Sequence, residues 1–440
     1  MKSFSKISVI FTLLVAFVVS QFSVAAPAKA ASADPLSLKA EAAMLLDAKT
    51  GKILYEKNAD KVLGVASMSK MMTEYIVMES IKEGKITWDD KVNINEYVHN
   101  LSKGDGLSNI GLTQGEDYTV KELYEAMAIF SGNAATVALA EKIAGSEKNF
   151  VTMMNKKAKE LGMTKYKFVN ASGLNNSDLG GNIAAGGPND ENVMSARDIA
   201  TLAYRLLNDY PDVLDYSKQP KLKFRDGKVY PNFNWMLPGL IFQYEGVDGL
   251  KTGSTDFAGY CFTATAERDG QRFISVVMKS PSKNERFTDT RKVLDYAFAN
   301  FGKEQVLKAN YKPKGKEIEV EKGKEKHVAL TTKKPVELVV QKGTAKEYKP
   351  VIVIDKKKLN EDGKLVAPIK KGEKLGYVTV QSKNDPYGFL TKDGQKEVQV
   401  DLVAAEDVEK SNWFVLSMKA VGGFFADVWD SVSSMVKGWF

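Results

Sequence analysis

Two residues near the start of the chain could form a nucleophile with its own base. Ser67 and Lys70 stand three residues apart at the beginning of an apolar helical pattern, so their hydroxyl and amine can meet on one face of a helix. A serine is a poor nucleophile until a base takes its proton, and lysine acts as that base only when its pKa is lowered. The spacing alone does not decide, because Ser-x-x-Lys also begins at Ser3, Ser280 and Ser434.

Two further short motifs carry the side chains that such a pair needs. Lys251 begins Lys-Thr-Gly on an expected strand, and a second cation there would help to lower the pKa of Lys70. Gly253 in the same motif would let a substrate backbone approach closely. Ser131 and Asn133 flank a glycine in a break between two apolar helices, where they could supply a relay hydroxyl and a substrate-binding amide. The alternative interpretation is an ordinary helix-joining turn.

The histidines and the cysteine do not suggest another catalytic system. His99 and His327 lie far apart, and neither has a histidine or cysteine partner at ligand spacing. A Ser-His-Asp triad or a zinc site would be hard to build from them, and we expect both in exposed loops or strands. Cys261 is the only cysteine, so we predict no intramolecular disulfide, and we predict no metal or other cofactor.

Helix and strand signals alternate up to about residue 302. The apolar spacing after Ser67 predicts a helix that stops at Gly84, and Thr119 with Glu122 forms a capping box before another helix. Asp269-Gly270 between two β-rich runs predicts a hairpin. Further strands are expected at 42–46, 52–57 and around 247–255. The capped helix should cover 120–130, and one more helix should run from about 134 to Gly145. Sheet and helices together predict an α+β or α/β sandwich domain, and we assign the fold class as α+β.

The chain changes character after Phe301. Short Val/Ile runs separated by Lys, Glu and Gly continue to about Leu402 without a convincing helix, which predicts a small all-β second domain. Its alternating charges fit a solvated strand face. The formal net charge of +7 is spread along the chain, so nucleic-acid binding gains no support.

Both ends of the chain carry targeting signals. Lysines, an apolar run over 7–19 and an Ala-Lys-Ala sequence predict a secretory signal peptide over 1–30, although a retained anchor is the alternative. Residues 411–440 place apolar side chains on one helical face and charges on the other. Their apolar runs are too short to span a membrane, so we expect this helix to lie in the outer interface of the cytoplasmic membrane. The alternative is a helix packed on the β-rich domain.

The three motifs, in their order and on their expected elements, resemble those of penicillin-binding proteins and serine β-lactamases. The sequences "ASMSKMMT", "SGNAA" and "DGLKTGSTDFAGYCFTATA", together with the two targeting signals and the β-rich region, are similar to the low-molecular-mass D-alanyl-D-alanine carboxypeptidases of the penicillin-binding protein 5 type. The resemblance covers essentially the whole chain. It implies a β-lactamase/transpeptidase-like catalytic domain with a helix–sheet–helix arrangement.

The resemblance also implies a role for each residue of the three motifs. Ser67 would be the acylated nucleophile and Lys70 its general base. Ser131 would pass a proton to the leaving amine, with Lys251 supporting it, and Asn133 would hold the substrate amide. Thr252 and Ser254 would face the terminal carboxylate, and Gly253 lies between them in the strand. The backbone N–H groups of Ser67 and Ser254 would form the oxyanion hole.

Two positions outside the motifs bear on recognition of that carboxylate. Arg286 resembles a family arginine that helps to receive it, with an ordinary surface arginine as the alternative. Some members carry an arginine near the position of Phe233, and its absence here leaves part of the substrate contact in doubt.

The resemblance implies an exported enzyme that removes the terminal D-alanine from peptidoglycan pentapeptide stems and is inhibited covalently by β-lactam antibiotics. A serine β-lactamase and a non-catalytic wall-binding protein are the competing interpretations, and the oligomeric state stays open. No glutamate occurs in "LGMTKYKFVNASGLNNSDLGG", where a β-lactamase would carry its deacylating base. The expected organisation is a signal peptide (1–30), a catalytic domain (31–302), a β-rich domain (303–405) and an amphipathic helix (406–440).

Overall fold

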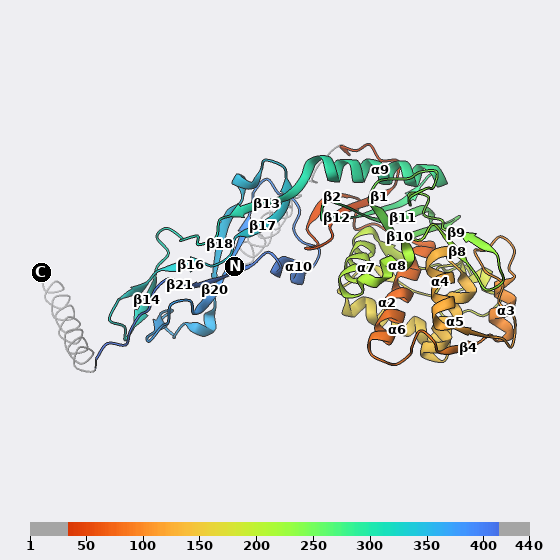
Figure 1. The fold of residues 1–440 in the computed structure, drawn as a ribbon, viewed down its shortest axis with the longest axis horizontal. Coiled ribbons are helices and arrows are strands. Elements are labelled where there is room, and N and C mark those ends of the chain that lie inside the picture. The colour runs from red at the N-terminus through yellow and green to blue at the C-terminus, as the bar shows by residue number, and fades with distance from the viewer. Residues whose placement is uncertain (1–33, 413–440) are drawn as a thin grey trace, which may run out of the picture. The chain divides into compact units, whose positions relative to one another are not determined.

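A five-stranded antiparallel sheet forms the centre of the larger part of the molecule. The computed structural model describes residues 34–412. The strand order is β10-β11-β12-β1-β2, so the first strand of the chain lies between the last strand of the sheet and its own hairpin partner (Figure 1). The strands are β1 (Ala42–Asp47), β2 (Ile53–Lys57), β10 (Val247–Thr255), β11 (Gly259–Arg268) and β12 (Gln271–Ser280).

Helices cover both faces of this sheet. The long helix α9 (Lys283–Asn300) lies along one face, and the other helices between residues 34 and 300 gather on the opposite face, with α7 packed against β12 and β1 (Figure 1). This arrangement confirms the predicted helix–sheet–helix fold. The second group comprises α2 (Lys70–Lys82), α3 (Glu96–Ser102), α4 (Val120–Phe130), α5 (Asn133–Ala144), α6 (Glu147–Glu160), α7 (Ala196–Asp209) and α8 (Leu214–Ser217).

Short strands pair in the connections between these helices. Three of them form one small sheet and four form two-stranded ribbons. They are β3 (Val62–Gly64), β7 (Val193–Ser195) and β6 (Tyr166–Lys167) in the sheet, and β4 (Lys91–Asn93) with β5 (Asp117–Thr119) and β8 (Lys221–Lys223) with β9 (Val229–Pro231) in the ribbons.

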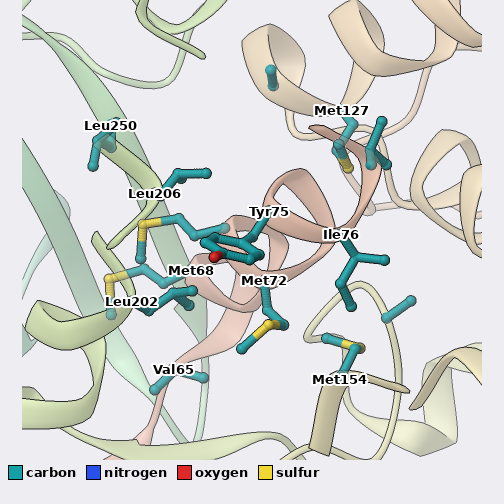
Figure 2. Close-up of a cluster of buried hydrophobic side chains, with 14 of the residues drawn as sticks. Val65, Met68, Met72, Tyr75, Ile76, Met127, Met154, Leu202, Leu206 and Leu250 are labelled. Carbon is teal, nitrogen blue, oxygen red and sulfur yellow. The ribbon is translucent and has the colours of Figure 1, made fainter. Parts of the chain in front are cut away.

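Helix α2 runs through the middle of the core and is buried on nearly every side. Its methionines and aliphatic side chains pack against neighbouring helices and the sheet, as Figure 2 shows. A helix that is apolar all round must be covered on all sides. In this cluster Met72, Tyr75 and Ile76 of α2 pack with Val65, Met68, Met127, Met154, Leu202, Leu206 and Leu250.

The turn signals of the sequence are confirmed. The Thr119 hydroxyl accepts the N–H of Glu122, and the Glu122 carboxylate accepts the N–H of Thr119, which completes the predicted capping box of α4. Asp269 and Gly270 both have positive φ, as a tight hairpin between β11 and β12 requires.

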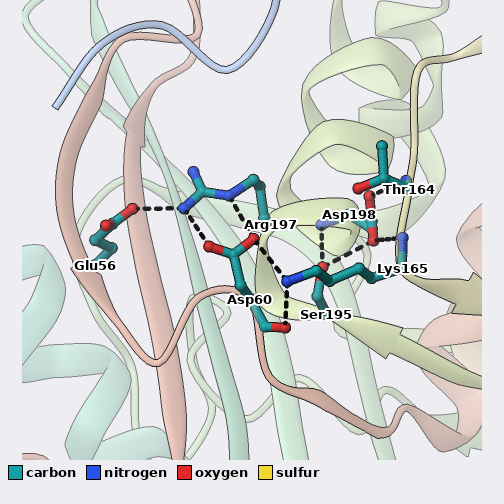
Figure 3. A network of polar contacts seen from close by, with 7 residues as sticks. All are labelled: Glu56, Asp60, Thr164, Lys165, Ser195, Arg197 and Asp198. Atoms are coloured by element: carbon teal, nitrogen blue, oxygen red, sulfur yellow. Dashed lines mark hydrogen bonds and ion pairs between the residues drawn. The ribbon is translucent and has the colours of Figure 1, made fainter. Parts of the chain in front are cut away.

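A polar network fixes the start of α7 against the strands that lead to the first motif (Figure 3). The Arg197 guanidinium donates to both carboxylate oxygens of Asp60 at 3.0 Å and to Glu56 at 2.9 Å. The Asp198 carboxylate accepts the N–H groups of Thr164 and Lys165 at 2.8 and 2.7 Å. These contacts join β2, the turn before β3 and the chain before β6, and β3 leads into the first motif.

The region after Phe301 is built from short strands around its own apolar clusters. This part is the predicted all-β region, although it contains one short helix that was not expected from the sequence. That helix forms because the Thr391 hydroxyl accepts the N–H of Gly394 at its start. The elements are β13 (Phe301–Leu307), β14 (Ile318–Glu321), β15 (His327–Val328), β16 (Leu330–Thr332), β17 (Val336–Gln341), β18 (Lys349–Ile354), β19 (Leu365–Val366), β20 (Lys374–Gln381), α10 (Lys392–Lys396) and β21 (Val400–Ala404).

The two histidines lie in different secondary structures. His327 lies on an exposed strand as predicted, but His99 lies half-buried in α3, where its Nδ1 is 2.6 Å from the carbonyl oxygen of Leu112. The predicted signal peptide over 1–30 lies outside the described residues, and so does the predicted amphipathic helix apart from 406–412. Those seven residues are not helical, and Val408 bridges to Ile369 in the β-rich part. Within residues 34–412, no helix is long and apolar enough to cross a membrane.

Candidate active site

The first motif begins in a 3-10 turn and not directly in an α-helix. The turn η1 (Ala66–Ser69) precedes α2, so Ser67 belongs to η1 and Lys70 is the first residue of α2. Residues three apart eclipse each other in a 3-10 helix, which brings the two side chains together. Ala66 enters the turn with a φ of 46°, a left-handed conformation that a non-glycine residue adopts only when its surroundings hold it there.

Ser67 and Ser69 have different environments, which separates the two serines of the motif. Ser67 is half-buried and its Oγ lies 2.9 Å from Lys70 Nζ. Ser69 is fully buried, donates its hydroxyl to the Ala66 carbonyl at 2.7 Å and accepts the Asn192 side-chain amide at 2.9 Å. Ser69 therefore holds the turn, while Ser67 is the serine within reach of both solvent and an amine.

Lys70 is buried and touches three oxygen atoms. Besides Ser67, its Nζ lies 2.7 Å from Asn133 Oδ1 and 2.7 Å from the Ser172 carbonyl oxygen. Burial and the neighbouring charge of Lys251 hold the pKa of Lys70 well below its usual range. The Asn-Ala-Ser-Gly stretch is a turn signal, but nothing in the sequence marks the Ser172 carbonyl as a partner of Lys70. Gly173 there has a φ of 81°, and a Cβ at that position would clash with the Ala66 carbonyl.

The second and third motifs meet beside this pair. Ser131 ends α4 in a left-handed conformation with a φ of 62°, and its Oγ accepts a hydrogen bond of 2.9 Å from Lys251 Nζ on β10. Asn133 begins α5, and its side-chain amide donates to the Ser108 carbonyl at 3.0 Å. Burial lowers the pKa of Lys251 to about 8. The Ser131–Asn133 motif therefore lies at a helix junction, as predicted. Its two polar side chains contact the two lysines, Asn133 with Lys70 and Ser131 with Lys251.

The rest of the Lys-Thr-Gly-Ser segment lies along β10 beside η1. Thr252 is buried and Ser254 is exposed. A Cβ on Gly253 would stand 2.6 Å from the Val65 carbonyl oxygen and 3.2 Å from the Ser67 nitrogen. Because Gly253 has no side chain, β10 can pack closely against η1, which carries Ser67. The expected close approach of a substrate backbone to Gly253 stays a prediction.

Arg286 is buried on α9, so its interpretation as a surface arginine is wrong. Only 2% of the Arg286 surface is exposed. Its guanidinium donates to the Gly253 carbonyl of β10 at 3.3 Å. Burial lowers its pKa to about 10. Phe233 stands where the resemblance would place an arginine, and its ring stacks on that of Phe130 with centroids 5.2 Å apart. The Lys283 ammonium lies 5.9 Å from the Phe233 ring centroid, so a lysine supplies positive charge close to this position.

A serine hydroxyl beside a buried lysine, with a second serine–lysine pair next to it, is the arrangement of a serine hydrolase that uses lysine in place of histidine. The family model for D-alanyl-D-alanine carboxypeptidase matches residues 28–282, and the model for the C-terminal domain of penicillin-binding protein 5 matches residues 301–410. The chain belongs to the D-alanyl-D-alanine carboxypeptidase family of serine peptidases.

Individual relatives agree with this assignment. The D-alanyl-D-alanine carboxypeptidase DacF of Bacillus subtilis is 34% identical over 413 residues, which cover 93% of this chain and 97% of the relative. Penicillin-binding protein 3 of Streptococcus pneumoniae has a TM-score of 0.71 and 34% identity over 85% of this chain and all of that one. Penicillin-binding protein D2 of Listeria monocytogenes, solved in its ampicillin-bound form, has a TM-score of 0.51 and 35% identity over 60% of this chain and 99% of that one.

Proposed function

We propose that this protein is a serine D-Ala-D-Ala carboxypeptidase that removes the terminal D-alanine from peptidoglycan pentapeptide stems through an acyl-enzyme on Ser67. The observation that carries the proposal is the 2.9 Å approach of Lys70 Nζ to the Ser67 hydroxyl in a site that also holds Ser131 and Lys251. The family relationship supports the choice of substrate.

The lowered pKa of Lys70 favours a neutral amine, and its three hydrogen-bond partners can accommodate that form. Asn133 Oδ1 and the Ser172 carbonyl can only accept, so they take two N–H groups of the amine. A neutral amine has one lone pair left, and the third neighbour is the Ser67 hydroxyl, which can donate to it. Lys70 is thereby placed to take the Ser67 proton as Oγ attacks the carbonyl carbon of the penultimate D-alanine.

The second lysine–serine pair is placed for the departure of the product. When the C–N bond breaks, the leaving amine of D-alanine needs a proton, and Ser131 would relay it with the support of the Lys251 charge. Water then hydrolyses the Ser67 ester and regenerates the enzyme. The N–H groups of Ser67 and Ser254 are proposed as the oxyanion hole, and Asn133 as the contact for the substrate amide.

Recognition of the terminal carboxylate is assigned to the strand β10 side of the site. Thr252 and Ser254 would donate hydroxyl groups to it, and Lys251 would contribute charge. Arg286 would act from behind the strand, since its guanidinium is buried against the Gly253 carbonyl.

β-Lactam antibiotics are proposed to acylate Ser67 and to leave slowly. The 161–181 segment contains no glutamate that could activate water, and the nearest following glutamate, Glu191, accepts the Thr255 hydroxyl at 2.7 Å.

The mature enzyme is proposed to act outside the cytoplasm after removal of residues 1–30, and to attach to the outer face of the cytoplasmic membrane through residues 411–440. The domain division at 31–302, 303–405 and 406–440 belongs to the same proposal.

The test is D-alanine release from a synthetic pentapeptide stem, followed by mass spectrometry of the protein after penicillin treatment. Ser67→Ala should abolish both release and labelling, and Lys70→Ala should slow acylation by several orders of magnitude. In Ser69→Ala the label should still lie on Ser67. Labelling of Ser69, rapid penicillin turnover or a complete lack of reaction would each contradict the proposal, the second in favour of a β-lactamase and the third in favour of a non-catalytic wall-binding protein.

A further inference from the structure

Two cations at the start of α9 have no acidic partner. Lys283 and Arg286 lie one helical turn apart, and in the part of the chain that the structure describes neither forms an ion pair with a carboxylate. The acids in the first half of α9 are engaged elsewhere. Glu285 pairs with Lys39 at 3.1 Å, and Asp289 accepts two backbone N–H groups of the chain before β1 at 3.2 and 2.7 Å. The two positive charges add to the positive end of the α9 dipole without a compensating negative charge.

Aromatic rings hold these two cations in place. The Lys283 ammonium lies 4.2 Å from the centroid of the Trp235 ring, and the Arg286 guanidinium lies 4.7 Å from that of the Phe287 ring. The Trp235 and Phe287 rings stack on each other with centroids 5.7 Å apart, so they form one support for both cations. A ring face attracts a cation but does not neutralise it. The positive charge therefore stays available to an anion.

Arg286 also has hydrogen-bonding capacity that its neighbours do not use. Its guanidinium donates to the Gly253 and Cys261 carbonyls at 3.3 and 3.5 Å, at the long end of the hydrogen-bond range. Its Nε is buried without a partner among the described residues. A buried donor without an acceptor is costly. Lys283 is only half-buried, so its ammonium can be reached from solvent.

The two cations lie next to elements that carry the second and third motifs. The Lys283 ammonium is 5.9 Å from the Phe233 ring centroid, and Phe233 stacks on Phe130, the residue before Ser131. On the other side, Arg286 contacts the Lys-Thr-Gly segment of β10. A small anion beside this segment would therefore come close to Lys251, Arg286 and Lys283 together.

We propose that Lys283 is a specificity-determining residue that acts with Arg286 to select substrates ending in a free carboxylate. The inference rests on the proposed function, which places the terminal carboxylate of the stem peptide against β10. That carboxylate would supply the negative charge and the acceptor oxygens that the two cations lack. Burial and the Arg286 charge lower the pKa of Lys283, and a bound carboxylate would oppose the effect of that charge.

The test compares two synthetic stem peptides, one ending in free D-alanine and the other in D-alaninamide. Lys283→Met removes the charge and keeps an unbranched side chain that can pack on Trp235. Its kcat/KM for the acid should fall by about 10-fold, mainly through a higher KM, because it loses a contact made in both the ground state and the transition state. Its kcat/KM for the amide should equal that of the wild type.

Two variants serve as controls. Lys283→Arg keeps the charge and should retain most of the wild-type rate on the acid. Lys159→Met removes an equal charge from an exposed position on α6 and should match the wild type on both peptides. Equal losses on acid and amide in Lys283→Met would indicate a structural role, and no loss on the acid would show that the charge is unused. Either result would overturn the inference, whereas a wild type that releases no D-alanine from the acid would overturn the proposed function.

Acylation by penicillin provides a second measurement that does not depend on turnover of the amide. Benzylpenicillin carries a free carboxylate, which its methyl ester lacks. Mass spectrometry of the labelled protein should show that Lys283→Met slows acylation by benzylpenicillin but not by the methyl ester. A similar effect on both compounds would overturn the inference.

Discussion

At the scale of single residues, Gly253 determines how closely strand β10 can approach the nucleophile. Its missing side chain leaves space that the Val65 carbonyl and the backbone nitrogens of Ser67 and Met68 fill. These contacts are with backbone atoms, which cannot rotate away as a flexible side chain would. The position of Ser67 relative to Ser254, and with it the proposed oxyanion hole, therefore depends on this glycine.

We expect Gly253→Ala to displace the nucleophile turn. The added Cβ would stand 2.6 Å from the Val65 oxygen, so η1 or β10 must shift, and a displacement of that kind typically lowers a rate by about 100-fold. Stopped-flow acylation by penicillin measures the effect, with thermal unfolding to check the fold. Gly111→Ala is the matched control, because a Cβ there meets nothing within 4 Å. Equal acylation rates in the two variants would show that the contact is unimportant.

Residue patterns alone predicted which side chains meet, but not everything that holds them. The three motifs were recognisable because each combines a reactive side chain with a specific element boundary, at Ser67, Ser131 and Lys251. The Ser172 carbonyl was missed, since a backbone acceptor carries no residue-type signal.

At the scale of elements, α6 supports the loop that completes the Lys70 site. The Glu147 side chain on α6 accepts the Ala171 N–H at 2.8 Å, next to the Ser172 carbonyl that contacts Lys70. Its other carboxylate oxygen is buried without a partner among the described residues. Burial, offset by the bond from Ala171, raises the pKa of Glu147 to about 7.

This carboxyl should make folding stability depend on pH. The pKa in the folded state is above the ordinary value of 4.5, so the folded protein holds a proton that the unfolded chain has released. Stability should consequently fall as the pH rises from about 4.5 to about 7, by on the order of 3 kcal/mol from this group. Glu147→Gln should flatten that decline in urea unfolding at about pH 5 and pH 8. The exposed Glu245→Gln should leave it unchanged, and an equal decline in both variants would contradict the assignment.

Sequence periodicity predicted the elements better than their local geometry. The spacing after Ser67 correctly indicated a helix, because its apolar residues face the core whether or not the first turn is α-helical. It could not indicate that this turn is a 3-10 helix, which depends on the left-handed Ala66 and on the hydrogen bonds of Ser69. The hydrogen bond from Asn192 comes from a segment 123 residues away in the chain.

At the scale of the whole molecule, attachment to the membrane is expected to depend on the C-terminal segment alone. The cut belongs after Asn412, since the Ser411 N–H donates to the Lys322 carbonyl at 2.9 Å and removal of Ser411 would disturb the β-rich part. A protein ending at Asn412 should be found in the soluble fraction of cells with its penicillin labelling unchanged. The full chain should stay on membranes through a salt wash, because its attachment depends on apolar burial. Membrane retention of the shortened protein would contradict this role.

The position of β1 in the central sheet has a consequence for how the chain folds as it is made. Ala42 at the start of β1 pairs with Met278 at the end of β12, so the strand that emerges first gains its second neighbour only after nearly the whole catalytic region has been synthesised. Until then, the β1–β2 hairpin exposes an unpaired edge of apolar backbone, which is a site for wrong pairing. Such distant pairing slows folding, since the intervening chain must be ordered before the contact is gained. We therefore expect premature truncation anywhere before β12 to yield aggregation-prone chains and not smaller folded units.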